Sequence, residues 1–191
     1  MEKPDWVSWE DIHQCLYKAH SVNRKRGFNM LSQNFSAEKI RSYIEGRGNC
    51  FVALEGEKLI GVATIRFFKC RRWWAWNKTV AYPGFDGVLP EYQGTDVFLN
   101  LDSMRRDVIK KSGVRIIQSN TAENNDAVLR RFKGGGWKFV QYSPTAKDAD
   151  HYSIISVKWY DGCPWPDWFI SFMYNISKLY VRVRWKHGKK S

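Results

Sequence analysis

The chain has 191 residues and a formal net charge of +12, from 31 lysine and arginine residues against 19 aspartate and glutamate residues. Hydrophobic residues make up 43% of it, which excludes a disordered chain and favours one domain of ordinary size with an appendage. No apolar run approaches the roughly 20 residues of a membrane-spanning helix, and none follows the N-terminus, so we expect neither a membrane span nor a secretory signal.

The four cysteines are scattered, and no two of them form a CxxC pair. This spacing predicts neither a zinc site nor a disulfide framework, so we expect reduced thiols, no bound metal and a cytoplasmic location. The positive charge is uneven, because no acidic residue follows Asp167 and six basic residues beyond it supply half of the net charge. A basic segment of this kind suits an anionic membrane surface, a nucleic acid or an acidic partner.

Two helices are predicted near the N-terminus. Ser8 is followed three residues later by Asp11, which resembles a capping box and predicts a helix over residues 8–20. Ser36 is a second capping residue and predicts a short helix over residues 36–45.

The hydrophobic period then becomes that of strands. Residues 50–54 and 59–67 flank a turn and predict a β-hairpin. A basic, tryptophan-rich segment at residues 71–76 is predicted to be a loop. It leads into a third strand at residues 78–89, which a Pro-Gly pair at residues 83–84 interrupts.

Pro90 stops that strand, and residues 93–96 (Gln-Gly-Thr-Asp) open a helix that Ser112 and Gly113 end. One face of this helix is predicted from spacings of four, three and four residues: Val97, Leu101, Met104 and Val108. A short buried strand is predicted at residues 114–118.

The remaining elements are one helix and two strands. Residues 120–123 (Asn-Thr-Ala-Glu) resemble a capping box and predict a helix that ends at the three glycines of residues 134–136. Strands are predicted at residues 137–142 and 151–159. Helices and strands mixed in this order favour an α/β sandwich with a mixed sheet.

Three short motifs carry a resemblance to a known family. Residues 88–94 (Val-Leu-Pro-Glu-Tyr-Gln-Gly) resemble a strand end followed by a pyrophosphate loop, residues 124–127 (Asn-Asn-Asp-Ala) an N-x-x-A helix start, and residues 136–137 (Gly-Trp) a Gly-Phe pair. In this order and spacing they resemble the GNAT acetyltransferase superfamily, over about residues 5–160.

The resemblance implies a fold and a reaction. The fold is α/β, with a mixed, mostly antiparallel central sheet flanked by helices over residues 1–160 and a basic aromatic extension over residues 161–191. The reaction is transfer of an acetyl group from acetyl-CoA to a primary amine, in a ternary complex and without a metal. The acceptor, whether an amino sugar, a small metabolite or a protein, is left open.

The resemblance also implies where acetyl-CoA binds. A turn that joins a strand to a helix aims backbone N–H groups and the positive end of the helix dipole at one point, which suits a pyrophosphate. The implied coenzyme-binding residues are Val88, Leu89, Gln93, Gly94, Thr95, Asp96, Val97, Phe98 and Asn124.

Two positions of the loop depart from the family pattern Q/R-x-x-G-x-G/A. Asp96 stands in the fourth place and puts a negative charge beside a dianion site, unless it acts as a helix N-cap. Phe98 stands in the sixth place, where a small residue allows close approach of the backbone, and core packing is the favoured role for its ring.

The proton-transfer groups depart as well. The family's frequent tyrosine, which protonates the leaving thiolate, falls on Phe132, which has no proton to give. Asp86 is the first candidate for the base, since it should share a strand face with Val88, and its alternative is a turn residue. Tyr82 and His151 are weaker candidates. These departures keep a second reading open, a GNAT-fold binding module that has lost catalysis.

The basic aromatic extension is predicted to be separable from the domain. Its first part has helical spacing, with Phe169, Phe172, Met173, Ile176 and Tyr180 on one face, and residues 181–186 alternate as a strand would. This face is expected to pack on the domain or on a second copy in a homodimer. The alternative is a peripheral contact with the inner face of a membrane, which Trp73, Trp74 and Trp76 would join. Nucleic-acid stacking is the least favoured reading.

Overall fold

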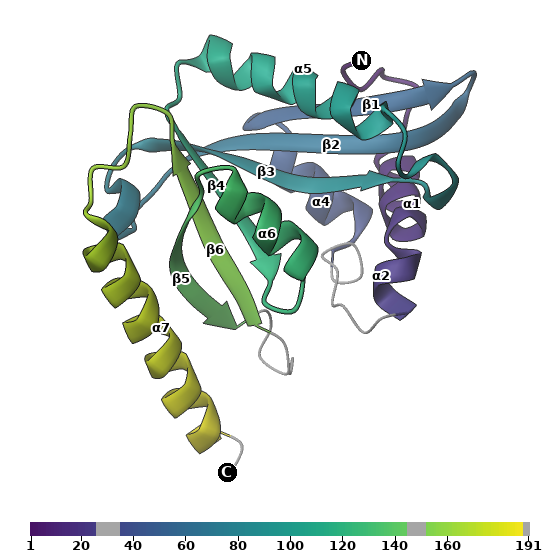
Figure 1. The fold of residues 1–191 in the computed structure, drawn as a ribbon. Helices are drawn as coiled ribbons and strands as arrows, with labels where there is room; N and C mark the ends of the chain where they lie inside the picture. Colours follow the sequence, from purple (N-terminus) through teal and green to yellow (C-terminus); the bar gives the residue numbers. More distant parts are fainter. Residues whose placement is uncertain (26–34, 145–151, 189–191) are drawn as a thin grey trace. The chain divides into compact units, whose positions relative to one another are not determined.

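The computed structural model describes residues 1–25, 35–144 and 152–188, and the chain divides into two compact units. The first unit comprises Met1–Arg71 and Asn77–Val114, and the second comprises Arg72–Trp76 and Arg115–Ser191. Each contains three strands in antiparallel pairs with helices packed on them, which confirms the α/β class (Figure 1).

Helices of the first unit begin where the capping residues predict. Helix α1 (Trp9–Ala19) starts after Ser8, whose hydroxyl accepts from the amide of Asp11 at 3.0 Å while the Asp11 carboxylate accepts from the amide of Ser8 at 2.9 Å. Helix α4 (Ala37–Ile44) starts after Ser36, whose hydroxyl accepts from the amide of Lys39 at 3.4 Å without a reciprocal bond. A short helix, α2 (Ser21–Lys25), follows α1 directly.

The predicted hairpin is confirmed, and a third strand pairs with its second strand. Strands β1 (Gly48–Glu55), β2 (Lys58–Lys69) and β3 (Thr79–Val88) pair antiparallel in chain order. The Pro-Gly pair at residues 83–84 does not end β3 but coincides with an irregularity in its pairing with β2, opposite Ala63 and Ile65. The buried hydroxyl of Thr64 accepts from the amide of Phe85 there, at 2.7 Å, so the displaced backbone keeps a partner.

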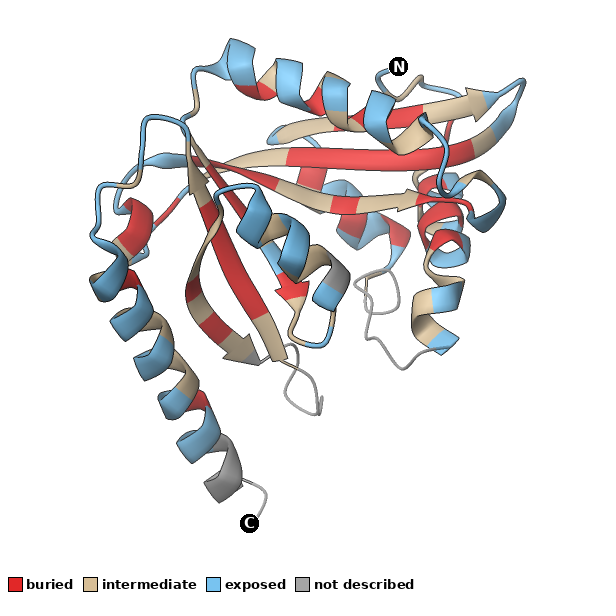
Figure 2. Cartoon of the chain, viewed as in Figure 1, coloured by how far each residue is buried: buried red, intermediate tan, exposed pale blue. Residues whose placement is uncertain are grey.

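Helices cover both faces of these three strands. Helices α1 and α4 cover one face and α5 (Val97–Ser112) the other, so the middle of the strands is buried (Figure 2). Gly87 is what lets α1 lie close to β3, because a Cβ there would come within 2.8 Å of the Ala19 Cβ. The core under α1 and α4 includes Ile12, Ile40 and Val62.

The face of α5 differs from the one predicted. Its buried residues are Leu101, Arg105 and Ile109, each four positions apart, whereas Met104 and Val108 are only half-buried. An arginine takes part in this stripe because an acidic group of β3 lies opposite it. Gly113, at φ +69°, ends α5 as predicted.

The second unit corrects one predicted boundary. Strand β4 (Ile116–Ala122) runs through the segment read as a capping box, and helix α6 (Asp126–Gly134) begins only after Asn125. The prediction was wrong because β4 pairs along its whole length with β6 (Tyr152–Trp159), and tertiary pairing outweighs a local capping signal. Strand β6 also pairs with β5 (Lys138–Pro144).

The extension forms one long helix of this unit. Helix α7 (Asp167–Gly188) continues through the residues that alternate like a strand, so the strand alternative was wrong. It packs on β5, and Val181 joins a small core with Tyr142 and Ile154. The side against β5 is not the predicted one, since Phe172, Ile176 and Tyr180 are exposed.

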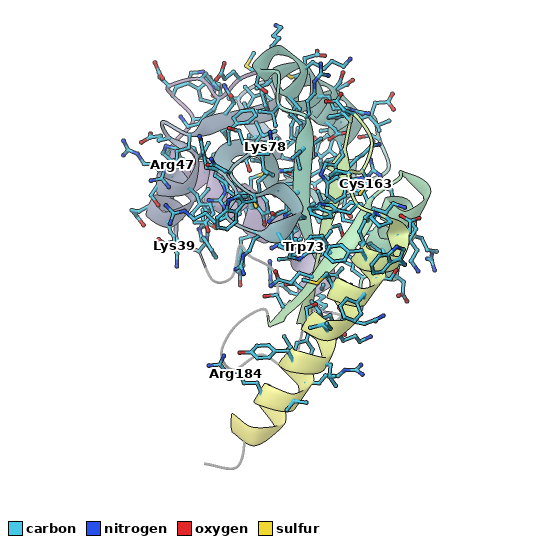
Figure 3. The ribbon with its side chains drawn as sticks, turned by 90° about the vertical axis from the view of Figure 1, so that its left-hand side faces the viewer. Lys39, Arg47, Trp73, Lys78, Cys163 and Arg184 are labelled. Atoms are coloured by element: carbon cyan, nitrogen blue, oxygen red, sulfur yellow. The ribbon has the colours of Figure 1, made fainter. Side chains whose placement is uncertain are left out.

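The tryptophan-rich segment at residues 71–76 forms a turn, and part of it is buried. It contains a 3₁₀ turn, η1 (Trp73–Ala75), and Trp74 is only 2% exposed, so Trp74 does not lie on a surface as the membrane reading had assumed. The Trp73 ring, labelled in Figure 3, contacts Phe169 in the first turn of α7 and Trp165 just before that helix, with ring centroids 5.4 Å and 5.9 Å away. Trp76 is exposed.

Candidate functional site

A tight turn joins the end of β3 to α5 in the first unit. The 3₁₀ turn η2 (Pro90–Tyr92) follows β3 directly, and the amide of Leu89 donates to the carbonyl of Ile60 at 2.9 Å. Gly94 comes next with φ +87°, a conformation that favours glycine. Apart from its chain neighbours, no heavy atom of the described residues lies within 4 Å of the place where its Cβ would be. The chain therefore bends sharply at Gly94, leaving open space beside it.

The side chain of Gln93 holds this turn in place. Its amide nitrogen donates to the carbonyl of Ala19 at 3.1 Å and to the carbonyl of Val88 at 3.0 Å. One side chain thus ties the loop to the end of α1 and to the end of β3. The side-chain amide nitrogen of Gln93 is therefore already engaged by two backbone carbonyls.

Asp96 occupies the N-cap position of α5 without capping it. Its backbone is helical (φ −73°, ψ −4°), and its side chain makes no capping hydrogen bond. The hydroxyl of Thr95 accepts from the amide of Val97 at 3.4 Å instead. The first amides of an α-helix have no intrahelical acceptor and carry its positive end. The exposed Asp96 carboxylate therefore lies at a helix end that favours an anion.

A hollow of about 300 Å³ lies beside the end of β3, and its wall carries three cations. Arg24 stacks on Tyr17, with its guanidinium carbon 3.7 Å from the ring centroid, and Lys58 pairs with Glu91 at 3.1 Å. The Lys18 side chain makes no hydrogen bond or ion pair with any of the described residues. The hollow is lined by Tyr17, Lys18, Ser21, Arg24, Lys58, Leu89, Pro90 and Glu91.

Asp86 lies on the face of β3 that meets α5, the face on which Val88 also lies, as predicted. Its carboxylate accepts from the buried guanidinium of Arg105 at 2.6 Å, and Arg105 also pairs with Asp102. Burial opposes the charge on Arg105, but the two carboxylates raise its pKa. Arg105 was not among the predicted site residues, although its spacing of four from both Leu101 and Ile109 places it on the buried stripe.

His20 completes this cluster from the end of α1. Its ring Nε2 lies 2.8 Å from the backbone carbonyl of Asp86. Burial lowers the pKa of His20, more than the hydrogen bond to Asp86 raises it, so the neutral ring with a proton on Nε2 is favoured. Asp86 is thus engaged through both its carboxylate and its backbone.

Tyr82 lies on the opposite face of β3, in an aromatic cluster around a cation. The guanidinium carbon of Arg66 is 3.8 Å from the ring centroid of Tyr43, 4.9 Å from that of Tyr82 and 5.2 Å from that of Phe68. The Nε atom of Arg66 is buried without a hydrogen-bond partner among the described residues. Burial raises the pKa of Tyr82 to about 12, so its phenol holds its proton at neutral pH.

The sequence matches no family model and no curated protein, but solved structures share its fold. The ribosomal-protein-S18-alanine N-acetyltransferase from Escherichia coli is 16% identical, with a TM-score of 0.60 over 82% of this chain and 90% of that chain. The NatC complex bound to Gag peptide and CoA contains a chain that is 14% identical, with a TM-score of 0.60 over 83% of this chain and 97% of that one.

A third neighbour, an acetyltransferase of the GNAT family from Staphylococcus aureus Mu50, is 10% identical, with a TM-score of 0.60 over 84% of this chain and 97% of that chain. The chain has the GNAT fold. The likeness covers strands and helices of both units, and it confirms the fold that the three motifs implied. Because the sequence identities are between 10% and 16%, the similarity to these structures shows the fold alone.

Of the other residues singled out by the GNAT resemblance, Phe98 is half-buried in the first turn of α5, and Asn124 and Phe132 lie in the second unit. Asn124 is exposed in the turn between β4 and α6, directly before the capping residue Asn125. Phe132 stacks on Trp137 with ring centroids 4.6 Å apart and planes 21° apart, so its ring has a packing partner. His151 lies outside the described residues, as do residues 26–34 of the expected acceptor region.

Proposed function

We propose that the protein is an N-acetyltransferase that moves an acetyl group from acetyl-CoA to a primary amine. The observation that carries this proposal is the β3–α5 turn of a GNAT fold, in which Gly94 bends the chain at φ +87° and Gln93 clamps it against α1 and β3. A neighbour of the same fold is bound to CoA. The turn presents the N-terminal amides of α5, which suit the pyrophosphate of the coenzyme.

The residues around this turn fit the coenzyme in charge and in space. The open position beside Gly94 admits a phosphate, and Lys18 supplies a positive charge in the adjoining hollow. The Asp96 carboxylate opposes binding, so we expect the affinity to be weaker than the turn alone would give. When bound, acetyl-CoA supplies the thioester that the amine attacks.

The proton that leaves the attacking amine needs a base. Asp86 and Tyr82 remain the proposed candidates, and their surroundings separate them. Asp86 already serves as the counter-ion of Arg105, and Tyr82, with a pKa of about 12, is suited to donating a proton rather than taking one. This favours a base that acts through water, with Asp86 as a positioning residue.

The acceptor side of the proposal rests on the Arg66 cluster. A half-buried guanidinium usually has an acidic partner, and Arg66 has only aromatic rings among the described residues. An acceptor amine that also carries a carboxylate or phosphate would supply the missing anion. We therefore propose that this cluster binds the acidic group of the acceptor, with the rings of Tyr43 and Tyr82 as walls.

Binding of acetyl-CoA tests the coenzyme half directly. Isothermal titration should show binding, and Gly94→Ala should weaken it because alanine strains a backbone at φ +87°. Gly56→Ala is the matched control, since Gly56 also has a positive φ of +59° with no atom near its Cβ position but lies in the β1–β2 turn. No binding of millimolar acetyl-CoA would overturn the proposal.

Release of the CoA thiol in the presence of amines tests the acceptor half. Amines bearing a carboxylate or phosphate should react faster than their neutral amides or esters, and Arg66→Gln should remove that preference while leaving acetyl-CoA binding unchanged. The specific observation that favours the alternative, a binding module without catalysis, is the packing of Phe132 on Trp137 where the family places its acid. Tight acetyl-CoA binding without thiol release from any amine would establish that alternative.

A further inference from the structure

Helix α7 has one side committed to the second unit. Ile170 and Val181 are buried on this side, and Tyr174 contacts the rings of Phe139 and Tyr142. The hydroxyl of Ser177 accepts from the amide of Tyr142 in β5, at 2.8 Å. These contacts fix the rotation of α7 about its own axis, and with it the residues that point away from the unit (Figure 2).

The side that points away is apolar along the described length of the helix. At 3.6 residues per turn, its exposed apolar residues fall within an arc of about 120° on the side away from Ile170 and Val181. Their exposed fractions run from 45% to 71%: Trp168, Phe172, Ile176, Leu179, Tyr180 and Val183. A stripe of this size and continuity indicates a surface that is covered in use.

Positive charges flank the stripe on both sides. Arg182 borders one side of the arc and Arg184, which Figure 3 labels, borders the other. The Arg184 guanidinium donates a hydrogen bond to the Tyr180 hydroxyl. No acidic residue follows Asp167 in the sequence. A binding partner for this surface must therefore have both an apolar region that can cover the stripe and negative charges that can pair with the flanking cations.

These two requirements select among occupants. A second copy would bring the same cations against one another, which opposes a homodimer through this face. A nucleic acid supplies negative charge, but it lacks an apolar surface that would bury the aliphatic side chains of Ile176, Leu179 and Val183. A bilayer containing anionic lipids offers acyl chains for the stripe and headgroups for the flanking cations.

We propose that α7 is an interfacial helix that docks this protein on an anionic lipid bilayer. The helix lies in the plane of the surface, with the arc from Trp168 to Val183 at the boundary between headgroups and acyl chains and with Arg182 and Arg184 among the headgroups. No described helix is long and apolar enough to cross a membrane. The proposal stands whether or not the protein acetylates an amine, since it rests on α7 alone.

Flotation of the full chain with vesicles tests the proposal. The protein should float with vesicles of phosphatidylcholine and phosphatidylserine, and much less with phosphatidylcholine alone. Leu179→Glu should lower partitioning at least about tenfold, because it puts a charge in the centre of the arc. Leu99→Glu is the matched control: Leu99 is an exposed leucine of α5, 52% exposed against 65% for Leu179, and its variant should float like the parent.

A second measurement reports the depth of insertion. Brominated acyl chains should quench the fluorescence of the parent more than that of Trp168→Phe, because Trp168 lies in the arc and is exposed. Circular dichroism of each variant should match the parent, since all three substituted side chains are exposed. The proposal is overturned if the parent does not float with anionic vesicles, if Leu179→Glu floats as the parent does, or if Leu179→Glu instead abolishes self-association in sedimentation.

Discussion

At the scale of single residues, Asp86 is the acidic group that the sequence singles out for proton transfer, and the structure gives it Arg105 as a partner. Removing one partner of a buried ion pair leaves an uncompensated charge. We expect Asp86→Asn to lower the free energy of unfolding by about 2 kcal/mol, less than a full buried pair, because Asp102 still faces Arg105. Chemical denaturation measures the change.

Glu91→Gln is the control for Asp86→Asn, because it removes the acidic half of the exposed Lys58–Glu91 pair and should leave the free energy of unfolding nearly unchanged. Thiol release by Asp86→Asn then separates the two roles. A variant that keeps the parent's stability and loses turnover would make Asp86 the base instead of the counter-ion.

His20 predicts a pH dependence of stability. Burial holds the pKa of His20 below its unfolded value of about 6.5, so between the two values the unfolded chain binds more protons than the folded chain. Its contribution to stability is therefore full above about pH 6.5 and is lost as the pH falls through the folded pKa. His20→Gln should be less stable at pH 7.5 and lose less on acidification to pH 5.5; parallel losses in the two proteins would contradict this.

At the scale of elements, the first turn of α5 carries a carboxylate that the coenzyme would meet. Asp96→Ala should raise the affinity for acetyl-CoA, by more at low salt than at high salt, because it removes a charge of the same sign as the phosphates. Stability should change little, since the Asp96 side chain makes no capping hydrogen bond. Asp107→Ala, an exposed acid farther along α5, should leave the affinity unchanged in the same titrations.

The contact of α1 with β3 depends on a missing side chain. Gly87→Ala would place a methyl group 2.8 Å from the Ala19 Cβ and 3.3 Å from Leu16 Cδ2, so α1 has to move outward. We expect a loss of about 1–3 kcal/mol in the free energy of unfolding. Gly134→Ala in α6 has no atom within 4 Å of the new Cβ and should be neutral or slightly stabilising. Equal effects would show that α1 has room to adjust.

At the scale of the whole molecule, α7 is the part whose role changed most between sequence and structure. The sequence predicts that the extension is separable, so that a chain ending at Asp161 would fold without α7, and the boundary at residue 160 remains a prediction. In the second unit, however, α7 covers β5 and contributes Val181 to the core with Tyr142 and Ile154. We now expect the shortened chain to be less stable and less soluble; unchanged thermal unfolding would restore the separable extension.

Much of the local structure could be predicted because its signals act over a few residues. Ser8 with Asp11, Ser36 and Gly113 satisfy or end backbone hydrogen bonds of their own helices, so they fix those ends wherever the helices pack. The turn at Gly94 belongs to the same class, and this is why the sequence could locate a tight turn between β3 and α5.

The tertiary structure decided which faces are covered, because burial depends on partners far away in the sequence. Arg105 is drawn into the core of α5 by Asp86, and β4 continues past its local capping signal because β6 pairs with it. The composition of α7 determines a basic, amphipathic helix. Only its contact with β5 determines that Ile170 and Val181 face inward, and that the stripe from Trp168 to Val183 is left exposed for another surface.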